Sequence, residues 1–195
     1  AGIGMSIMHD AQHQAYTYSH RINEWIGQSI LLIGGFGYNW KIQHNILHHT
    51  YTNISDYDDD IDDKSILKLS PKNSSKWYHR YQHYYAFLFY SIATLYWCTI
   101  KDILQMIRYR KEGHNRLSHQ DNISMWAKLL VTRILYFVLF LGVPTWIFHI
   151  PLEKVLIGFI SMHLLAGLIL TVVFQLAHTV EGTRHPIPSE DGKMN

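Results

Sequence analysis

The sequence predicts an all-α integral membrane protein with a transmembrane hairpin, interfacial helices and a histidine-rich metal-binding cap on the cytoplasmic face. Apolar runs at residues 129–149 and 152–174 are each long enough to cross a bilayer as a helix. Charged residues gather in separate stretches between the apolar runs, which is typical of membrane proteins. The chain also holds 14 histidines in 195 residues, an excess that favours metal binding because neutral imidazole is a common metal ligand.

The apolar segments predict different membrane roles. Residues 1–8 resemble the end of a transmembrane helix, and residues 129–149 and 152–174 form a transmembrane hairpin that turns at Pro151. Within the hairpin, Arg133 is expected to snorkel to the interface and Pro144 to kink its helix. Residues 22–40 are broken by glycines and are expected to lie in the interface or to dip into the membrane and return. Residues 84–100 are short and rich in aromatic residues, which are favoured at the interface, so their membrane role is ambiguous.

Composition and the two ends of the sequence limit the alternatives. The formal net charge of +2 is too small to indicate a nucleic-acid partner. The single Cys98 excludes an internal disulfide pair and a CxxC metal site. The first residues belong to an apolar helix and the last to a polar loop, so residues 1–195 are expected to be a partial domain, truncated at both ends.

Two histidine clusters are the main indication of chemistry. HDAQH places His9 and His13 four residues apart, and HNILHH repeats this spacing with His44 and His48 before adding His49. Residues at i and i+4 share one face of an α-helix, so each pair can reach one ion or two adjacent ions. Neighbouring residues on a helix point about 100° apart, so His48 and His49 can serve two neighbouring metals.

Several residues near the clusters have open roles. Asp10 either fixes the tautomer of His9 through its second ring nitrogen or only solvates a helix end. The acidic run DYDDDIDD is expected to be a solvated loop, although a role behind the ligands or at a substrate headgroup stays open for some members. These members are Asp56, Asp58, Asp59 and Asp60. His163, inside an apolar run, is expected to be a core histidine with satisfied hydrogen bonds.

A parity argument relates the clusters to the hairpin. If both clusters share one metal site, they must lie on the same side of the membrane. A single crossing by residues 22–40, the segment between them, is then excluded. If residues 84–100 also stay at the interface, the hairpin returns His178 to the side of the clusters. The basic region that holds Arg108, Arg110 and Arg116 then lies on the cytoplasmic side, as the positive-inside rule prefers.

The motifs HDAQH, HNILHHTYTN and FQLAHTVE resemble the histidine boxes and flanking motifs of the membrane fatty acid desaturases, with most likeness to the bacterial front-end, linoleoyl-CoA-type group. The resemblance covers essentially the whole chain. It implies a non-haem diiron centre whose ligands include His9, His13, His44, His48, His49 and His178. Asp10, which follows His9, is a candidate for supporting that ligand. Gln175 is a second candidate, because its neighbour Phe174 stands where characterised relatives carry a water-holding asparagine. The third histidine box of the family is absent, so the fragment itself is expected to be inactive.

The resemblance also implies the reaction and its partners. A fatty acyl desaturase introduces a cis double bond into an acyl-CoA or acyl-lipid substrate, using dioxygen and two electrons from a ferredoxin or a small haem protein. The unactivated C–H bond carries no acidic proton, so no catalytic side chain is expected beyond the metal centre. The implied location is the bacterial inner membrane, with the histidine clusters on its cytoplasmic face.

Three other readings are weighed against this one. A hydroxylase or ketolase of the same superfamily would use the same histidines. A membrane zinc metallopeptidase would use HDAQH in place of HExxH, but it gives no reason for the second cluster. A metal-transport protein would place histidines within the spans, where only His163 lies.

Overall fold

The structure is a computed structural model that describes residues 2–54, 57–59, 66–69 and 74–178. The described residues form helices and connecting loops without a strand, so the all-α prediction is confirmed. The first half holds short helices, namely α1 (Gly2–Gln12), α2 (His20–Gly27), the 3-10 helix η1 (Gln28–Ile33), α3 (Gly37–Trp40) and the π-helix η2 (Lys41–His48).

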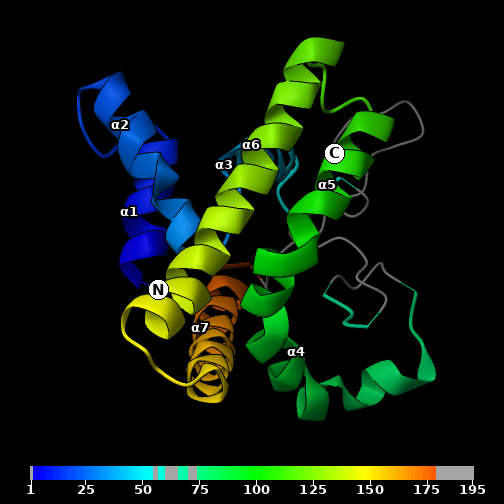
Figure 1. Cartoon of the computed structure of the whole chain (residues 1–195). Helices are drawn as coiled ribbons and strands as arrows, with labels where there is room; N and C mark the ends of the chain where they lie inside the picture. Colours follow the sequence, from blue (N-terminus) through cyan, green and yellow to red (C-terminus); the bar gives the residue numbers. More distant parts are fainter. Residues whose placement is uncertain (1, 55–56, 60–65, 70–73, 179–195) are drawn as a thin grey trace, which may run out of the picture.

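The second half holds three long helices. The first runs without a break over Trp77–Lys111 and consists of η3 (Trp77–Tyr81), α4 (Gln82–Tyr96), η4 (Trp97–Lys101) and α5 (Asp102–Lys111). The second consists of α6 (His119–Phe137) and η5 (Val138–Ile147), and the third is α7 (Leu152–His178). In Figure 1, α1 and α2 lie on the left, and α4 and α7, which pack together, lie in the lower half. Helix α6 contacts η1.

Each long helix is long and apolar enough to cross a membrane. Many of their large apolar side chains face outward, which soluble proteins avoid in contiguous patches but lipid favours. The extent of one helix differs from the sequence prediction. Residues 84–100, whose membrane role is ambiguous in the sequence, lie in the 35-residue helix Trp77–Lys111, which is a third candidate span. The parity argument assumes that residues 84–100 do not cross the membrane, and this assumption stays a prediction.

The helices begin and pack for identifiable reasons. Ser118 caps α6, because its Oγ accepts a hydrogen bond from the backbone N–H of Asp121 at 3.1 Å. Helices α4 and α7 pack closely and antiparallel, with Thr94 beside His163 and Ser91 beside Gly167. A Cβ atom at Gly167 would lie 2.8 Å from the carbonyl oxygen of Tyr90 and closer still to that of Ser91, so this contact needs a glycine.

Polar contacts join the long helices inside their apolar surroundings. His163 is buried, with Tyr136 Oη 2.9 Å from its Nε2 and Thr94 Oγ1 3.1 Å from its Nδ1, which confirms a satisfied core histidine. The prediction that Arg133 snorkels to the interface is wrong. Its guanidinium is largely buried and pairs with the buried Asp102 at 2.6 Å, because that carboxylate offers a closer partner than the interface.

Candidate metal centre

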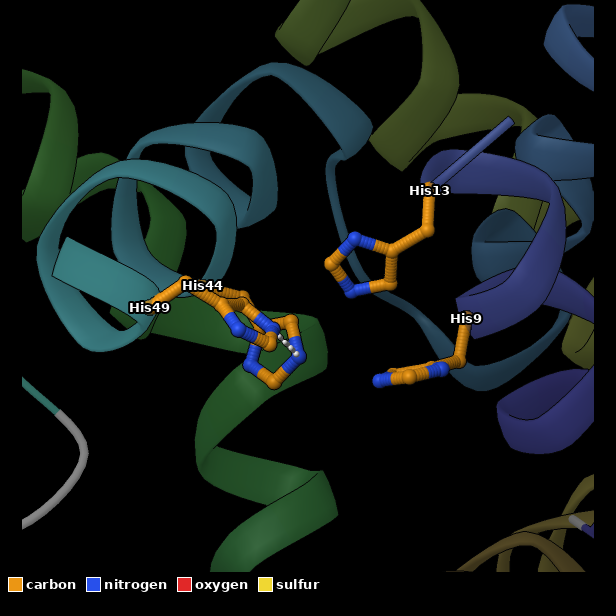
Figure 2. Close-up of side chains that lie close together, drawn as sticks. All are labelled: His9, His13, His44 and His49. Atoms are coloured by element: carbon orange, nitrogen blue, oxygen red, sulfur yellow. Dashed lines mark hydrogen bonds between the residues drawn. The ribbon is translucent and has the colours of Figure 1, made fainter. Parts of the chain in front are cut away.

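Four histidines from the two clusters meet in one place. His9 and His13 come from α1 and the residue after it, and His44 and His49 come from η2 and the residue after it. One ligand nitrogen from each lies within 4.8 Å of the others. Figure 2 shows the four rings facing a common space between α1 and η2. The sequence prediction that the two clusters come together therefore agrees with the observed geometry.

The end of α1 positions the first pair. Gln14 adopts a left-handed conformation with φ of 60°, and the N–H of Ala15 donates to the carbonyl oxygen of Asp10 at 2.8 Å. This pattern is a Schellman motif, which stops the helix directly after His13. His9 and His13 keep the i, i+4 relation, with ring centroids 4.5 Å apart.

A π-helix positions the second cluster. Its backbone bonds join i to i+5 rather than i to i+4, so the turn is wider than in an α-helix. His44 and His49 are five residues apart, and their Nε2 atoms lie 3.3 Å from each other. His48 stacks on His44 with ring centroids 5.2 Å apart and lies outside the group of four. The sequence analysis assumed α-helical spacing and did not anticipate this arrangement.

Two amides join the clusters to each other and to the glycine-broken segment. Asn45, next to His44, donates through Nδ2 to the carbonyl oxygen of Gln12 at 3.3 Å. Gln12 is buried and donates through Nε2 to the carbonyl oxygen of Gly27 at 3.0 Å. A Cβ atom at Gly27 would lie 3.0 Å from Gln12 Nε2, so the glycine allows this close approach. The arrangement of α1 against η2 is therefore fixed beside the histidines themselves.

Trp40 forms an apolar wall of the site. Its ring stacks on His44 with centroids 4.5 Å apart and lies edge-on to His9 and His13, each at 6.0 Å. Trp40 is buried in a core cluster with Met8, Ile30 and Ile33. Sequence reasoning missed this residue, although its position four before His44 was a usable signal.

The electrostatics favour neutral imidazole, the form that binds metals. Burial, followed by the neighbouring His9, His49 and His44, lowers the pKa of His13 to about 4, while Asp10 opposes the shift. Nε2 of His13 is buried and has no hydrogen-bond partner among the residues that the structure describes. A buried lone pair of this kind is costly unless a ligand uses it.

Carboxylates fix two ring tautomers. His48 donates through Nδ1 to both oxygens of Asp58, at 2.9 and 3.0 Å, and both side chains are buried. Asp58 also accepts from the backbone N–H of Asn53 at 2.7 Å. Asp10 accepts from Nδ1 of His9 at 3.2 Å in a more exposed setting. In both histidines the lone pair then lies on Nε2, where it is available to a metal.

The acidic run is not a solvated loop at the two described aspartates Asp58 and Asp59, so that prediction is wrong there. Asp59 is buried, pairs with Arg108 at 2.5 Å and accepts from Oη of Tyr109 at 2.5 Å. The carboxylates of Asp58 and Asp59 accept hydrogen bonds from other parts of the chain, and these bonds offset the free-energy cost of removing the carboxylates from water. Asp56 and Asp60 lie outside the described residues.

The donor set fits transition-metal ions. Metal–imidazole bonds of about 2.0–2.1 Å place two nitrogens on the same ion roughly 3–4 Å apart. The nitrogens of His44 and His49, 3.3 Å apart, meet this requirement, and the spread of 4.8 Å over all four allows one ion or an adjacent pair. His178 ends α7, but its side chain lies outside the described residues, and Gln175 is half-buried in the last turns of α7.

Comparison with known proteins agrees with this geometry. The chain matches the family of fatty acid desaturases over residues 1–191. The chain belongs to the fatty acid desaturase family. No solved structure matches it.

One relative is the Arthrospira platensis protein named sn-1 linoleoyl-lipid 6-desaturase. It is 35% identical to this chain, and the match covers 93% of this chain and 48% of the relative. A Synechocystis protein of the same name is 29% identical over 100% of this chain and 54% of its own length. An acyl-lipid (8-3)-desaturase of Physcomitrium patens is 30% identical over 100% of this chain and 40% of its own length. The chain thus spans about half the length of the first of these relatives.

Proposed function

We propose that the whole protein is an acyl-lipid desaturase, which introduces a cis double bond into a lipid-bound acyl chain with dioxygen and two electrons. The observation that carries the proposal is the convergence of four imidazoles from two separate clusters within 4.8 Å, in a chain of the fatty acid desaturase family. The relatives are named for action on acyl lipids, which favours a lipid-bound substrate over other acyl carriers.

The proposed centre holds two iron ions. His9, His13, His44 and His49 are the proposed ligands of the described cluster, and His48 and His178 are proposed to complete the set that this chain provides. When bound, such a centre supplies the oxidising power needed to remove two hydrogen atoms from an unactivated acyl chain. The six histidines of this chain would hold only part of such a centre, and the rest of the full-length protein would supply the remaining ligands.

The protein side chains hold and orient this centre. Asp58 and Asp10 keep the Nε2 lone pairs of His48 and His9 free for metal, and Trp40 restricts rotation of the His44 ring. No side chain needs to act as an acid or base toward the acyl carbon, because its hydrogens are not acidic. The task of the polypeptide is therefore to keep the metals and one acyl carbon pair in register.

The membrane arrangement is proposed from the helices. Residues 1–8 are proposed to end a transmembrane helix, and residues 129–149 and 152–174 are proposed to form a transmembrane hairpin, with residues 1–195 as part of a longer desaturase domain. The histidines are proposed to face the cytoplasm at a bacterial inner membrane, where a ferredoxin or a small haem protein can deliver electrons.

Expression of the full-length protein in a desaturase-deficient host tests the proposal. We expect lipids whose acyl chains have lost two hydrogens by mass spectrometry, whereas a gain of oxygen would indicate a hydroxylase. His44→Gln and His49→Gln should abolish the product, while the matched control His20→Gln, at an exposed histidine outside the cluster, should retain it. Purified protein that contains one zinc ion and no iron would contradict the proposal and favour a metallopeptidase.

A further inference from the structure

A second polar site lies at the start of the helix Trp77–Lys111, away from the histidine cluster. It is a cavity of about 400 Å³ whose lining includes Lys68, Lys76, His79 and Arg80. In Figure 1, η3 is the short blue-green helix that leads into α4 at the lower right. Three cationic side chains and one histidine around one small cavity indicate an anionic ligand.

The cavity is held by side-chain contacts with the helix. Gln82 accepts from the backbone N–H of Lys68 at 3.0 Å and donates to its carbonyl oxygen at 3.2 Å. Tyr85 donates through Oη to the carbonyl oxygen of Ile66 at 3.0 Å. These bonds fix the loop at Ile66–Lys68 against α4, so the position of Lys68 relative to the helix is defined.

The helix start brings in the other basic groups. The backbone N–H of Lys76 donates to Nδ1 of His79 at 3.1 Å, so Nε2 of His79 carries a proton and is a hydrogen-bond donor. The guanidinium of Arg80 lies 4.8 Å from the centre of the Tyr81 ring. Within the part of the chain that the structure describes, no carboxylate lies in ion-pair contact with Lys68, Lys76 or Arg80. No described carboxylate therefore neutralises the charge of these three side chains.

The residues around this cavity are of the kinds found at the level of lipid headgroups. Trp77 and Tyr84 are 79% and 77% exposed, and they immediately precede the apolar part of a candidate membrane span. Exposed tryptophan and tyrosine at the end of an apolar helix are typical of the membrane–water interface. Lysine and arginine at this depth attract anionic lipid headgroups.

We propose that this cavity binds the phosphate group of a membrane phospholipid. Arginine offers a planar pair of donors to phosphate oxygens, and lysine adds further charge-assisted donors. A soluble phosphate compound such as coenzyme A carries the same group, so the test includes it. The proposal depends on the cavity and not on the proposed desaturase activity.

Native mass spectrometry of the full-length, delipidated protein in detergent micelles measures the binding. We expect dioleoyl phosphatidylglycerol to bind and dioleoyl glycerol, which lacks phosphate, not to bind. Lys76→Gln with Arg80→Gln should raise the dissociation constant about 20-fold, since each basic residue near the membrane surface contributes about a fivefold effect. The control pair Lys111→Gln and Lys128→Gln removes the same charge at two exposed positions and should leave the constant unchanged.

A charge-preserving pair, Lys76→Arg with Arg80→Lys, separates loss of charge from loss of folding and should keep binding within about threefold of the unmodified protein. The proposal is overturned if Lys76→Gln with Arg80→Gln binds the phospholipid as tightly as the unmodified protein. It is also overturned if dioleoyl glycerol binds equally well, or if only coenzyme A binding responds to the substitutions. Iron content and fatty acid products play no part in this readout, so its failure leaves the proposed function untouched.

Discussion

Replacement of Asp58 by asparagine tests how the histidine cluster is oriented. The carboxylate accepts from His48 Nδ1 at 2.9 and 3.0 Å and from the backbone N–H of Asn53 at 2.7 Å. An asparagine has nearly the same shape but carries one N–H₂ group, which in either orientation faces a donor. If that group donates to His48 Nδ1, the ring proton moves to Nε2 and the lone pair proposed to bind metal is lost.

The size of the effect follows from the contact. Substitution of a group that orients a metal ligand typically lowers metal affinity 10- to 100-fold, about 1.4–2.7 kcal/mol. We expect Asp58→Asn to fall in the upper part of this range, because Asp58 and His48 are both buried and water cannot replace the carboxylate. Anaerobic titration of the full-length protein with Co²⁺ against a chromophoric chelator measures the affinity, and the d–d absorption reports the ligand set.

Asp59→Asn is the matched control. It makes the same change in charge one residue away, at a buried carboxylate that contacts Arg108 and Tyr109 rather than a histidine. We expect it to lower thermal stability while leaving Co²⁺ affinity within about twofold. A folded Asp58→Asn protein with unchanged Co²⁺ affinity and absorption would refute the role of Asp58 in orienting His48.

Three further substitutions test the packing, each by unfolding of the full-length protein in mixed micelles. Trp40→Ala should cost about 3–5 kcal/mol because it empties a buried aromatic site; a loss below about 1 kcal/mol would contradict this packing. Gly167→Ala should lower the free energy of unfolding because its Cβ meets the α4 backbone, whereas Gly158→Ala, with no atom within 4 Å, should be neutral or stabilising by up to about 1 kcal/mol; equal effects would argue against the close contact. Arg133→Met should cost about 3–5 kcal/mol by leaving Asp102 buried and unpaired, and Asp102→Leu added to it should restore part of the loss; no restoration would show that the pair is not the cause.

The parts of this fold that were predictable depend on local spacing. His9 and His13 lie on an ordinary α-helix, so their i, i+4 relation in the sequence is also their relation in space. The long apolar runs likewise predicted helices that could cross a membrane. These inferences needed only helical periodicity and length, which act over a few turns.

The parts that were missed depend on contacts between distant segments. The sequence kept a role behind the ligands open for Asp56, Asp58, Asp59 or Asp60, but it did not single out Asp58, which lies ten residues from His48 and contacts its ring. The pairing of Arg133 with Asp102 joins two helices, so local sequence suggested a snorkelling side chain instead. The sequence also did not indicate that residues 84–100 belong to a continuous 35-residue helix, which extends well beyond the apolar run at both ends.

The π-helix in η2 decides which of two adjacent imidazoles joins the group of four. Removal of one residue between His44 and His48 would shorten the wide turn to an ordinary one, and the last histidine of the cluster would then follow His44 by four positions. The number of residues in this turn thus decides which histidine lies beside His44 in the group of four, and a family member with a different count there would bring another side chain to that position without any change in its histidine content.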